Sequence, residues 1–287
     1  MRYLAAEPSA GGKMEQDFSV NLKGKVAVVT GSTQGLGADI ALALCAAGAW
    51  VLIVGRGLEE GRATEARLQA VGQARFMPTD IRDDAQLDAC VQAALEQTGR
   101  LDILVNNACS YGDEGLASSR ALWHETLDVN LVSGAILAQK VCPHMVPGSV
   151  IINMGSTGGK FGVAGRALYP ASKAAILQLT KSLAVELAPA GIRVLAVSPA
   201  WTWSPAVERM SGGSREQADQ VGAQVHPLGR VGSGSEIAQA VLFAVSGAAS
   251  WMTGVDLPVD GGFSVLGPEQ GRSPRHWFQV WAQKQAG

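Results

Sequence analysis

Cysteine is scarce in this sequence, and the four cysteines show no metal-binding spacing. Cys45, Cys90, Cys109 and Cys142 are scattered, without a CxxC pair or another zinc signature. Scattered thiols of this kind are typical of a reducing compartment, where they stay free and mostly buried. The distribution therefore predicts a cytoplasmic protein with no metal site.

Long runs of one charge and long apolar runs are also missing. The formal net charge is −2, which argues against nucleic acid or an anionic membrane surface as the main partner. The longest uncharged run, residues 40–55, contains Gly48 and is too short to cross a bilayer. The N-terminus shows no charged-then-apolar signal pattern. We therefore expect neither a nucleic-acid partner nor a membrane partner.

The composition supports a large folded core. Hydrophobic residues make up 47% of the 287 positions and charged residues 17%, so disorder is not expected. Short apolar runs alternate with helical stripes, which predicts a single α/β domain with a doubly wound, seven-stranded parallel sheet, a Rossmann-like fold. The predicted strands are residues 25–30, 50–54, 73–78, 101–105, 149–154, 192–197 and 254–259.

Three segments depart from this alternation. Residues 1–21 are polar and aperiodic, which predicts a flexible N-terminal tail before a domain that covers residues 22–266. Residues 267–287 form a C-terminal tail whose aromatic side chains we expect to dock on the same or a neighbouring subunit. Residues 206–232 are polar with glycines in their middle, and we interpret them as a lid or an ordinary surface excursion. The aromatic residues of the C-terminal tail are Trp277, Phe278 and Trp281.

A tyrosine and a lysine in the second half of the chain suggest acid–base chemistry. Tyr169 and Lys173 are four positions apart, so on a helix they share one face. An ammonium beside a phenol favours the phenolate and lowers the tyrosine pKa from its usual value of about 10, which permits proton exchange near neutral pH. Ser156 follows a strand-like run and can point its hydroxyl into the same cleft. Taken alone, such a pair is more often an ordinary surface pair.

A glycine-rich turn lies upstream of this pair, between a predicted strand and a predicted helix. Residues 30–37 read TGSTQGLG. Glycines let the backbone approach a pyrophosphate, and the helix N-terminus supplies free N–H groups and a partial positive charge. A tight turn that serves packing alone is the alternative interpretation. The strand–turn–helix context favours a dinucleotide phosphate site.

In this order, the two motifs resemble those of the short-chain dehydrogenase/reductase family in its single-domain form. The resemblance covers residues 22–263. The positions that match the family's TGxxxGxG turn are Gly31, Gly35 and Gly37, and those that match its catalytic Ser-Tyr-xxx-Lys set are Ser156, Tyr169 and Lys173. The resemblance implies an oxidoreductase that uses a nicotinamide dinucleotide.

The resemblance also implies a fourth catalytic residue and an oligomer. Asn130 matches the position whose side-chain amide disturbs a helix and holds a water that links the lysine to solvent. The alternative is a helix asparagine bonded to its own backbone. Residues 119–142 are predicted as one long helix interrupted at Gly134. In the family, the helices that carry Asn130 and Lys173 form a four-helix interface, which implies a homodimer or a homotetramer.

By the same resemblance, several segments are expected to contact the cofactor. Asp80 faces the adenine in the family, although it can also cap the helix that follows. The expected contacts beside the three glycines are Ser32, Gln34, Leu36, Arg56, Asp80, Ile81, Asn107, Ala108, Pro199, Ala200 and Thr202, with Tyr169 and Lys173 at the nicotinamide end.

The end of the second strand bears on the choice of cofactor. An acidic residue there would bond the adenosine ribose and favour NAD, whereas a basic residue accepts a 2′-phosphate. This chain has Gly55-Arg56, which resembles the family members that prefer NADP. Gln34 does not supply the second basic residue that many of those members carry. NADP is therefore the expected cofactor, with NAD as the alternative.

Two positions depart from the family pattern. Cys109 stands where NNAG has its glycine, and a cysteine tolerates positive φ poorly. We interpret Cys109 either as a small buried residue or as a reactive thiol that lines the cleft. Ala200 replaces the glycine of the usual proline–glycine step.

The sequence thus predicts reversible hydride transfer between NADP(H) and a carbonyl or secondary alcohol. In this hypothesis Tyr169 exchanges the proton, Ser156 bonds the same oxygen, and Lys173 acidifies Tyr169 and holds the ribose. An NAD-linked alcohol or dihydrodiol dehydrogenase and a non-catalytic cofactor sensor are the alternatives. The residues expected near the substrate pocket are Phe161, Arg166, Trp201 and Trp203.

Overall fold

The computed structural model describes residues 20–267 and 269–285. The strands are β1 (Val26–Thr30), β2 (Trp50–Gly55), β3 (Gln73–Pro78), β4 (Leu101–Asn106), β5 (Met145–Met154), β6 (Arg193–Pro199) and β7 (Asp256–Val259). They form one parallel seven-stranded sheet in the order β3-β2-β1-β4-β5-β6-β7. The strand order reverses between β1 and β4, and ligands bind at such a reversal in doubly wound sheets. The predicted fold class is confirmed.

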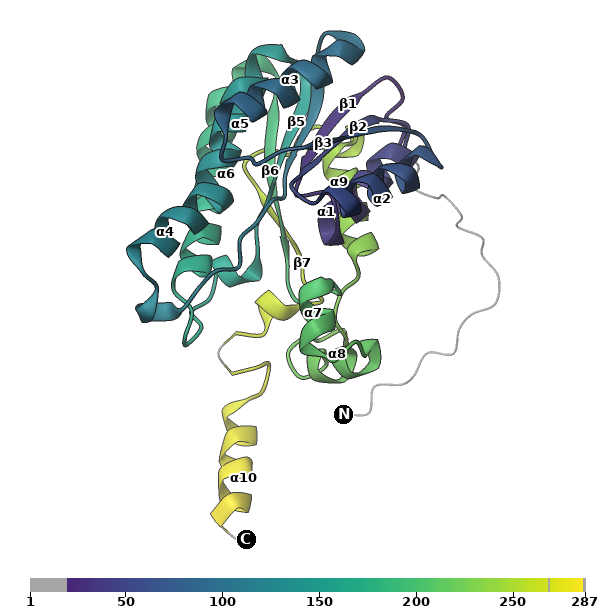
Figure 1. Cartoon of the computed structure of the whole chain (residues 1–287). Helices are drawn as coiled ribbons and strands as arrows, with labels where there is room; N and C mark the ends of the chain where they lie inside the picture. The colour runs from purple at the N-terminus through teal and green to yellow at the C-terminus, as the bar shows by residue number, and fades with distance from the viewer. Residues whose placement is uncertain (1–19, 268, 286–287) are drawn as a thin grey trace, which may run out of the picture.

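Helices cover both faces of the sheet, which explains why its central strands are apolar on both sides. Every residue of β1 is buried. One face carries α1 (Gly35–Ala46), α2 (Leu58–Gln69) and α9 (Gly234–Val245), and the other carries α3 (Asp84–Thr98), α5 (Ser133–Val141) and α6 (Leu168–Leu187) (Figure 1). The two covered faces hold the two hydrophobic clusters of the domain.

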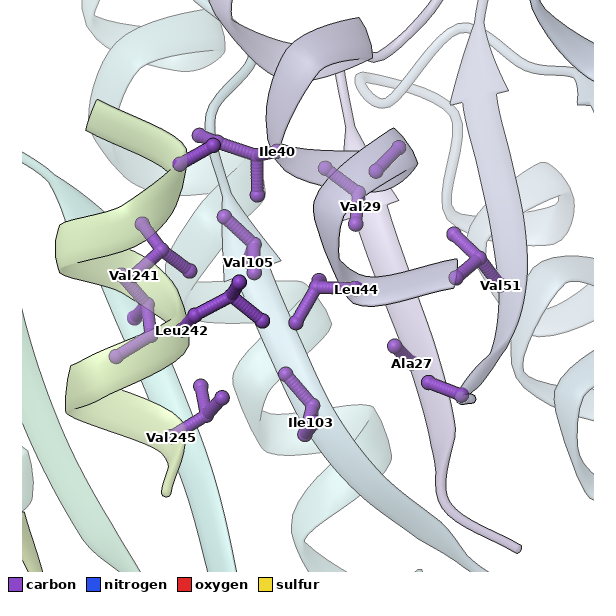
Figure 2. Packing of buried hydrophobic residues seen from close by; sticks show 14 of the residues in the cluster. Ala27, Val29, Ile40, Leu44, Val51, Ile103, Val105, Val241, Leu242 and Val245 are labelled. Carbon is purple, nitrogen blue, oxygen red and sulfur yellow. The ribbon is translucent and has the colours of Figure 1, made fainter. Parts of the chain in front are cut away.

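The cluster beneath α1 and α9 shows how apolar spacing fixes the helices on the sheet. Ile40 and Leu44 lie one turn apart on α1 and face Val241 of α9 (Figure 2). Val29 and Val105 rise from the neighbouring strands β1 and β4 to meet them. Each of these side chains is fully buried, and such burial contributes about 1.5–3 kcal/mol per residue. This packing holds the N-terminus of α1 above the end of β1.

Residues 119–142 form two helices with a π-helical turn between them, rather than one helix broken at Gly134. Helix α4 (Arg120–Leu127) ends in the turn Asp128–Val132, and α5 follows it directly. Gly134 lies within α5, and a Cβ at that position would make only an ordinary contact, 3.4 Å from Cγ of Asn106. The distortion therefore belongs to the turn around Asn130.

The polar insertion after β6 folds into α7 (Pro205–Met210) and α8 (Arg215–Gly222). Gly212 and Gly213 join them with φ values of 57° and 84°, which favour glycine. The side chains of Arg215 and Asp219 reach the main chain of Val231, each at 3.1 Å. The insertion is also tied to the rest of the domain, because the Leu228 N–H donates to the Gly261 carbonyl at 3.1 Å and Arg230 pairs with Glu236 of α9 at 2.6 Å.

Helix α10 (Pro274–Gln285) extends away from the α/β body (Figure 1). Its aromatic residues Trp277, Phe278 and Trp281 are 43%, 74% and 63% exposed, so the expected docking on their own subunit is not observed. Docking on a neighbouring subunit stays a prediction. Residues 1–19 of the predicted N-terminal tail lie outside the described residues. No helix in the described ranges combines the length and apolarity that crossing a membrane requires.

Candidate active site

The glycine turn connects β1 to α1 and requires glycine for two separate reasons. Gly31 and Gly35 have φ values of 61° and 58°, a region that L side chains avoid. A Cβ on Gly37 would overlap the Gly31 carbonyl oxygen and Nδ2 of Asn107. Gln34, the N-cap of α1, makes no capping hydrogen bond with its side chain. The N-terminus of α1 thus lies close to the surface, and the glycines of the turn have no side chains that would cover it.

Asn107 and Thr30 fasten this turn to the end of β4. Asn107 donates from Nδ2 to the carbonyl oxygens of Thr30 and Gly31, each at 3.0 Å. The Thr30 hydroxyl in turn accepts from the backbone N–H groups of Asn107 and Ala108. Ser32 is fully buried, and its hydroxyl donates to the Val29 carbonyl, so it holds the turn internally. Asn107 and Ser32 therefore position the turn.

The residues predicted to contact the adenosine of the cofactor include an acidic one, Asp80, and a basic one, Arg56. The Asp80 carboxylate pairs with Arg82 at 2.6 Å, and this hydrogen bond lowers the pKa of Asp80 to about 2. The helix that follows is capped by Asp83, so the alternative role of Asp80 as its cap is wrong. Arg56 is exposed just beyond β2, and its charge contributes to the lowered pKa of Asp80.

The backbone at Gly55 has no room for an acidic side chain. A Cβ at this position would lie 2.8 Å from Cγ2 of Thr33, and the two atoms would collide. Since Thr33 belongs to the glycine turn, the two loops pack directly on one another. The carboxylate typical of NAD sites therefore cannot be added at Gly55 without moving Thr33.

Ser156, Tyr169 and Lys173 meet at the carboxyl end of β5. Ser156 lies just past β5, where its hydroxyl accepts from the Gly158 N–H at 3.0 Å and is close enough to Tyr169 to lower the pKa of the phenol. Lys173 is buried, and its ammonium donates to the Met154 carbonyl at 2.8 Å. The Lys173 Nζ lies 5.8 Å from the centre of the Tyr169 ring. The three side chains that the sequence motif singled out are thus brought together.

The expected effect of Lys173 on Tyr169 is not observed. Burial raises the pKa of Tyr169 to about 12 and exceeds the lowering by the Ser156 hydrogen bond and by the charge of Arg166. Lys173 directs its ammonium to the Met154 carbonyl instead of the phenol. The prediction of an acidified Tyr169 is therefore wrong for this structure. The phenol stays protonated at neutral pH, which suits a proton donor.

Asn130 occupies the π-helical turn and bonds to a neighbouring loop. Its amide pairs with both backbone groups of Ser110, accepting at 2.6 Å and donating at 3.0 Å. Nδ2 also lies 3.0 Å from the Ser172 hydroxyl on α6. The alternative of an asparagine bonded to its own backbone is therefore wrong, and the distorted helix is confirmed.

A small cavity of about 10 Å³ lies behind this turn, a volume that matches one water molecule. It is lined by residues from segments that are far apart in the sequence, among them Thr30, Ile81, Ala108, Asn130 and Lys173. Two further lining atoms, Asn106 Oδ1 and Ser133 Oγ, are buried without a hydrogen-bond partner among the described residues. The cavity shows that predicted cofactor and catalytic residues converge.

The candidate residues in the segment after β6 differ in their burial and in their contacts. Pro199 ends β6, and Thr202 is buried with its hydroxyl donating to the Ala200 carbonyl at 3.2 Å. Trp201 is 45% exposed and packs edge-on against His226. Trp203 instead lies under the guanidinium of Arg215 on the insertion. Of the two tryptophans, Trp203 helps to hold α8.

Sequence reasoning singled out Cys109 and Arg166 but missed Tyr111 and Asp113, in the loop that follows β4. Tyr111 stacks on Tyr169 with ring centres 5.4 Å apart, and the guanidinium of Arg166 lies 4.8 Å from the Tyr169 ring. Cys109 has no positive φ, so its replacement of glycine causes no backbone strain, and it lies close enough to influence the Tyr169 pKa. Asp113 reaches the first turn of α6 from the same loop. No local pattern indicated the contacts of Tyr111 and Asp113.

The residues present fit a nicotinamide dinucleotide. The glycine turn forms a cradle that a Cβ at Gly31 would fill, since it would lie 2.7 Å from Cα of Ala108. The N-terminus of α1 offers free N–H groups for phosphates. A dinucleotide that extends across the strand reversal would reach from Arg56 toward Lys173.

The sequence of this chain is similar to those of known reductases and dehydrogenases. The family model described as enoyl-(acyl carrier protein) reductase matches residues 31–264. A D-threitol dehydrogenase from Mycolicibacterium smegmatis is 34% identical over 88% of this chain and 98% of its own length. A trans-4-hydroxycyclohexanecarboxylate dehydrogenase from Sinomonas cyclohexanicum is 35% identical over 83% of this chain and 92% of its own length.

The solved structures agree in fold. A 7α-hydroxysteroid dehydrogenase complexed with NADH and 7-oxo glycochenodeoxycholic acid has a TM-score of 0.79 and 30% sequence identity. The match covers 85% of this chain and 96% of that chain. The similarity therefore spans almost the whole α/β body of both proteins.

Proposed function

Because the chain belongs to the short-chain dehydrogenase/reductase family, whose members are oxidoreductases, we propose that it interconverts a carbonyl and a secondary alcohol with NADP(H). The observation that carries this proposal is the convergence of Ser156, Tyr169 and Lys173 beside the glycine turn. A protein that only sensed the cofactor would need the turn but not these three side chains. The alternative of a non-catalytic sensor is therefore not favoured.

In the proposed reduction, the chain handles the proton and the charge on the substrate oxygen. A nicotinamide cofactor, when bound, supplies the hydride to the carbonyl carbon. Tyr169 gives its phenolic proton to the carbonyl oxygen as negative charge develops there. Ser156 donates a hydrogen bond to the same oxygen and stabilises that charge. Oxidation of the alcohol reverses these steps, and the Tyr169 phenolate, formed once the phenol has lost its proton, takes the proton of the alcohol.

Lys173 and Asn130 act behind this pair in the proposed mechanism. The buried ammonium of Lys173 lies between the Met154 carbonyl and the Tyr169 ring, where it can hold the ribose of a bound cofactor. Asn130 maintains the π-helical turn that lines the small cavity next to Lys173. A water in that cavity would resupply the proton that Tyr169 gives up.

NADP is the proposed cofactor because of the charge and space at the end of β2. Arg56 supplies an exposed guanidinium for a 2′-phosphate, and Thr33 leaves no room for an acidic side chain at Gly55. NAD is the second candidate, since the 7α-hydroxysteroid dehydrogenase that shares the fold is complexed with NADH.

We also propose a dimer or tetramer in which α4, α5 and α6 meet a second copy. Val185 on α6 is 79% exposed and Val132 in the π-helical turn is 46% exposed. Apolar side chains on this outer face favour contact with another subunit. Light scattering of the purified chain would measure its mass, and a monomer at micromolar concentration would contradict the proposal.

The test is the consumption of NADPH with a panel of cyclic ketones, keto sugars and oxosteroids at fixed cofactor concentration. The panel follows the substrates named for the related dehydrogenases. We expect steady-state oxidation of NADPH with at least one ketone, and its loss in Tyr169→Phe. Turnover that is unaffected by this substitution would remove Tyr169 from the mechanism. Tight cofactor binding without turnover on any ketone or alcohol would support the sensor instead.

A further inference from the structure

The first turn of α6 is capped by a carboxylate that comes from a distant loop. Helix α6 begins at Leu168, and its N-cap residue, Ala167, has no side chain that could accept a hydrogen bond. Asp113, in the loop after β4, takes this role. Its Oδ1 accepts from the Ala167 N–H at 3.0 Å and its Oδ2 from the Tyr169 N–H at 2.9 Å. The carboxylate thus holds the backbone of Tyr169 itself.

The Asp113 side chain has almost no exposed surface, and both of its carboxylate oxygens accept hydrogen bonds. Its side chain is only 1% exposed, and Oδ1 also accepts from the Gly115 N–H at 2.9 Å. Burial raises its pKa, but the hydrogen bonds from Ala167, Gly115, Tyr169 and Leu168 outweigh burial and lower the pKa to about 2. The group therefore stays ionised at neutral and mildly acidic pH. A negative charge is favourable at a helix N-terminus.

The same loop also contacts the ring of Tyr169. Tyr111, two residues before Asp113, stacks on that ring with an interplanar angle of 20°. Arg166 lies over the ring at 4.8 Å, and its Nε is 3.6 Å from Oδ2 of Asp113. One carboxylate thereby fixes the backbone of Tyr169 and the cation above its ring.

We propose that Asp113 is a positioning residue for the reaction, because it sets the direction of the Tyr169 phenol from outside helix α6. This inference rests on the proposed function of Tyr169. Tyr169 lies in the first helical turn, where the backbone N–H groups have no helical partner and the chain frays unless it is capped. A displacement of about 1 Å at a reacting group can reduce the rate about 100-fold. Loss of the cap should therefore reduce turnover as well as stability.

The test compares Asp113→Asn with Asp102→Asn. Asp102 is likewise buried, at 2% exposure, accepts from the Val26 N–H at 3.0 Å and pairs with Lys25. It lies at the amino-terminal end of β4, whereas Ser156 and Tyr169 lie beyond the carboxyl-terminal end of β5. We expect both variants to lower the melting temperature. Only Asp113→Asn should lower kcat, by about tenfold or more, with the cofactor Kd unchanged.

A double variant separates positioning from general damage. In the Tyr169→Phe background, Asp113→Asn should cause no further loss of kcat while it still lowers the melting temperature. An equal loss of kcat in the presence and absence of the Tyr169 hydroxyl would overturn the proposal. A loss of kcat in Asp102→Asn as large as that in Asp113→Asn would also overturn it.

A third measurement does not depend on turnover. Carbon-13 NMR of labelled tyrosines, assigned with Tyr169→Phe, follows the ionisation of the Tyr169 phenol in each variant. Loosening of the first turn exposes the phenol, so Asp113→Asn should bring its pKa down toward the ordinary value and Asp102→Asn should not. An unchanged titration in Asp113→Asn would refute the proposal. If the native chain reduces no ketone while this shift is seen, the proposed function fails and the positioning of Tyr169 stands.

Discussion

The glycine turn after β1 and the reaction centre at the start of α6 both lie at the carboxyl-terminal ends of the strands, but different contacts maintain them. In the turn, the backbone packs so closely that Gly31 and Gly37 have no room for a side chain. At the reaction centre, side chains from distant segments surround Tyr169. The turn therefore depends on the absence of side chains in one short segment, whereas the reaction centre depends on side chains from several segments.

This difference predicts that substitutions in the two regions affect different quantities. A change in the glycine turn should act on cofactor affinity, because that is where the backbone must approach the phosphates. A change around Tyr169 should act on turnover, because its hydroxyl is used only when the substrate oxygen gains charge. The comparison would fail if a substitution in the turn changed turnover alone, or if a substitution around Tyr169 changed cofactor affinity alone.

The largest effect is expected at Tyr169. The Tyr169→Phe variant keeps the ring that packs on Tyr111 and loses only the hydroxyl. Removing a general acid costs about 100- to 10,000-fold in rate, so kcat should fall by about 1,000-fold with the cofactor Kd unchanged. Stopped-flow kinetics and fluorescence titration of the cofactor measure the two quantities. A weakened cofactor affinity would show that the two regions are not separate.

The second effect is expected at Gly37. In Gly37→Ala the new Cβ collides with the Gly31 carbonyl and the Asn107 amide, and overpacking of this kind costs about 1–3 kcal/mol. We expect the cofactor Kd to rise by up to about 100-fold. Calorimetric titration with the cofactor measures the change.

Gly247→Ala is the matched control for Gly37→Ala, because no atom lies within 4 Å of a Cβ placed at Gly247. Its cofactor affinity should equal that of the native chain. Native affinity in Gly37→Ala would mean that the cofactor does not need this close backbone approach.

How far the sequence predicted these two regions follows from the same difference. The turn was predictable because its glycines and the strand and helix beside it are consecutive in the chain. The gathering of Ser156, Tyr169 and Lys173 was predictable from the resemblance and the helical spacing. The cap on α6 was not, because Asp113 and Tyr169 are 56 residues apart and only the fold brings them together.

Two errors have a similar physical origin. The interruption of the helix was placed at Gly134, whereas the distortion occurs around Asn130, where the family resemblance had placed it and whose amide bonds to Ser110 in another loop. The acidified phenol was expected from the spacing of Tyr169 and Lys173 alone. Spacing does not report burial, and burial raises the pKa of Tyr169.

The third effect is expected at Arg56. An exposed charged group that bonds one phosphate contributes modestly, so Arg56→Ala should weaken NADPH binding by about tenfold and leave NADH binding unchanged. Raised salt should reduce the difference, because it screens an exposed contact. Arg120→Ala, which removes an exposed charge at the start of α4, is the control. Equal affinities of the native chain for NADPH and NADH would reject the NADP proposal.

The smallest effect is expected in the ionisation of Tyr169. The hydrogen bond from Ser156 lowers the pKa of the phenol, which burial has raised to about 12, so Ser156→Ala should raise it further. At a given alkaline pH, less phenolate should then appear in carbon-13 tyrosine spectra than in the native chain or in Ser235→Ala, a remote and exposed control. More phenolate in Ser156→Ala would mean that the serine does not stabilise charge on this oxygen.

The raised pKa of Tyr169 also fixes the sign of a pH effect on stability. The folded chain binds the phenolic proton more tightly than the unfolded chain, whose tyrosines titrate at about 10. The free energy of unfolding should therefore fall as the pH rises from about 10 to about 12, because the unfolded state releases the proton first. Urea titrations across this range should show a shallower fall in Tyr169→Phe, since that variant has no phenol to titrate there. An identical slope in both chains would show that Tyr169 titrates alike in the folded and unfolded states, and burial would then not be the property that distinguishes the reaction centre from the turn.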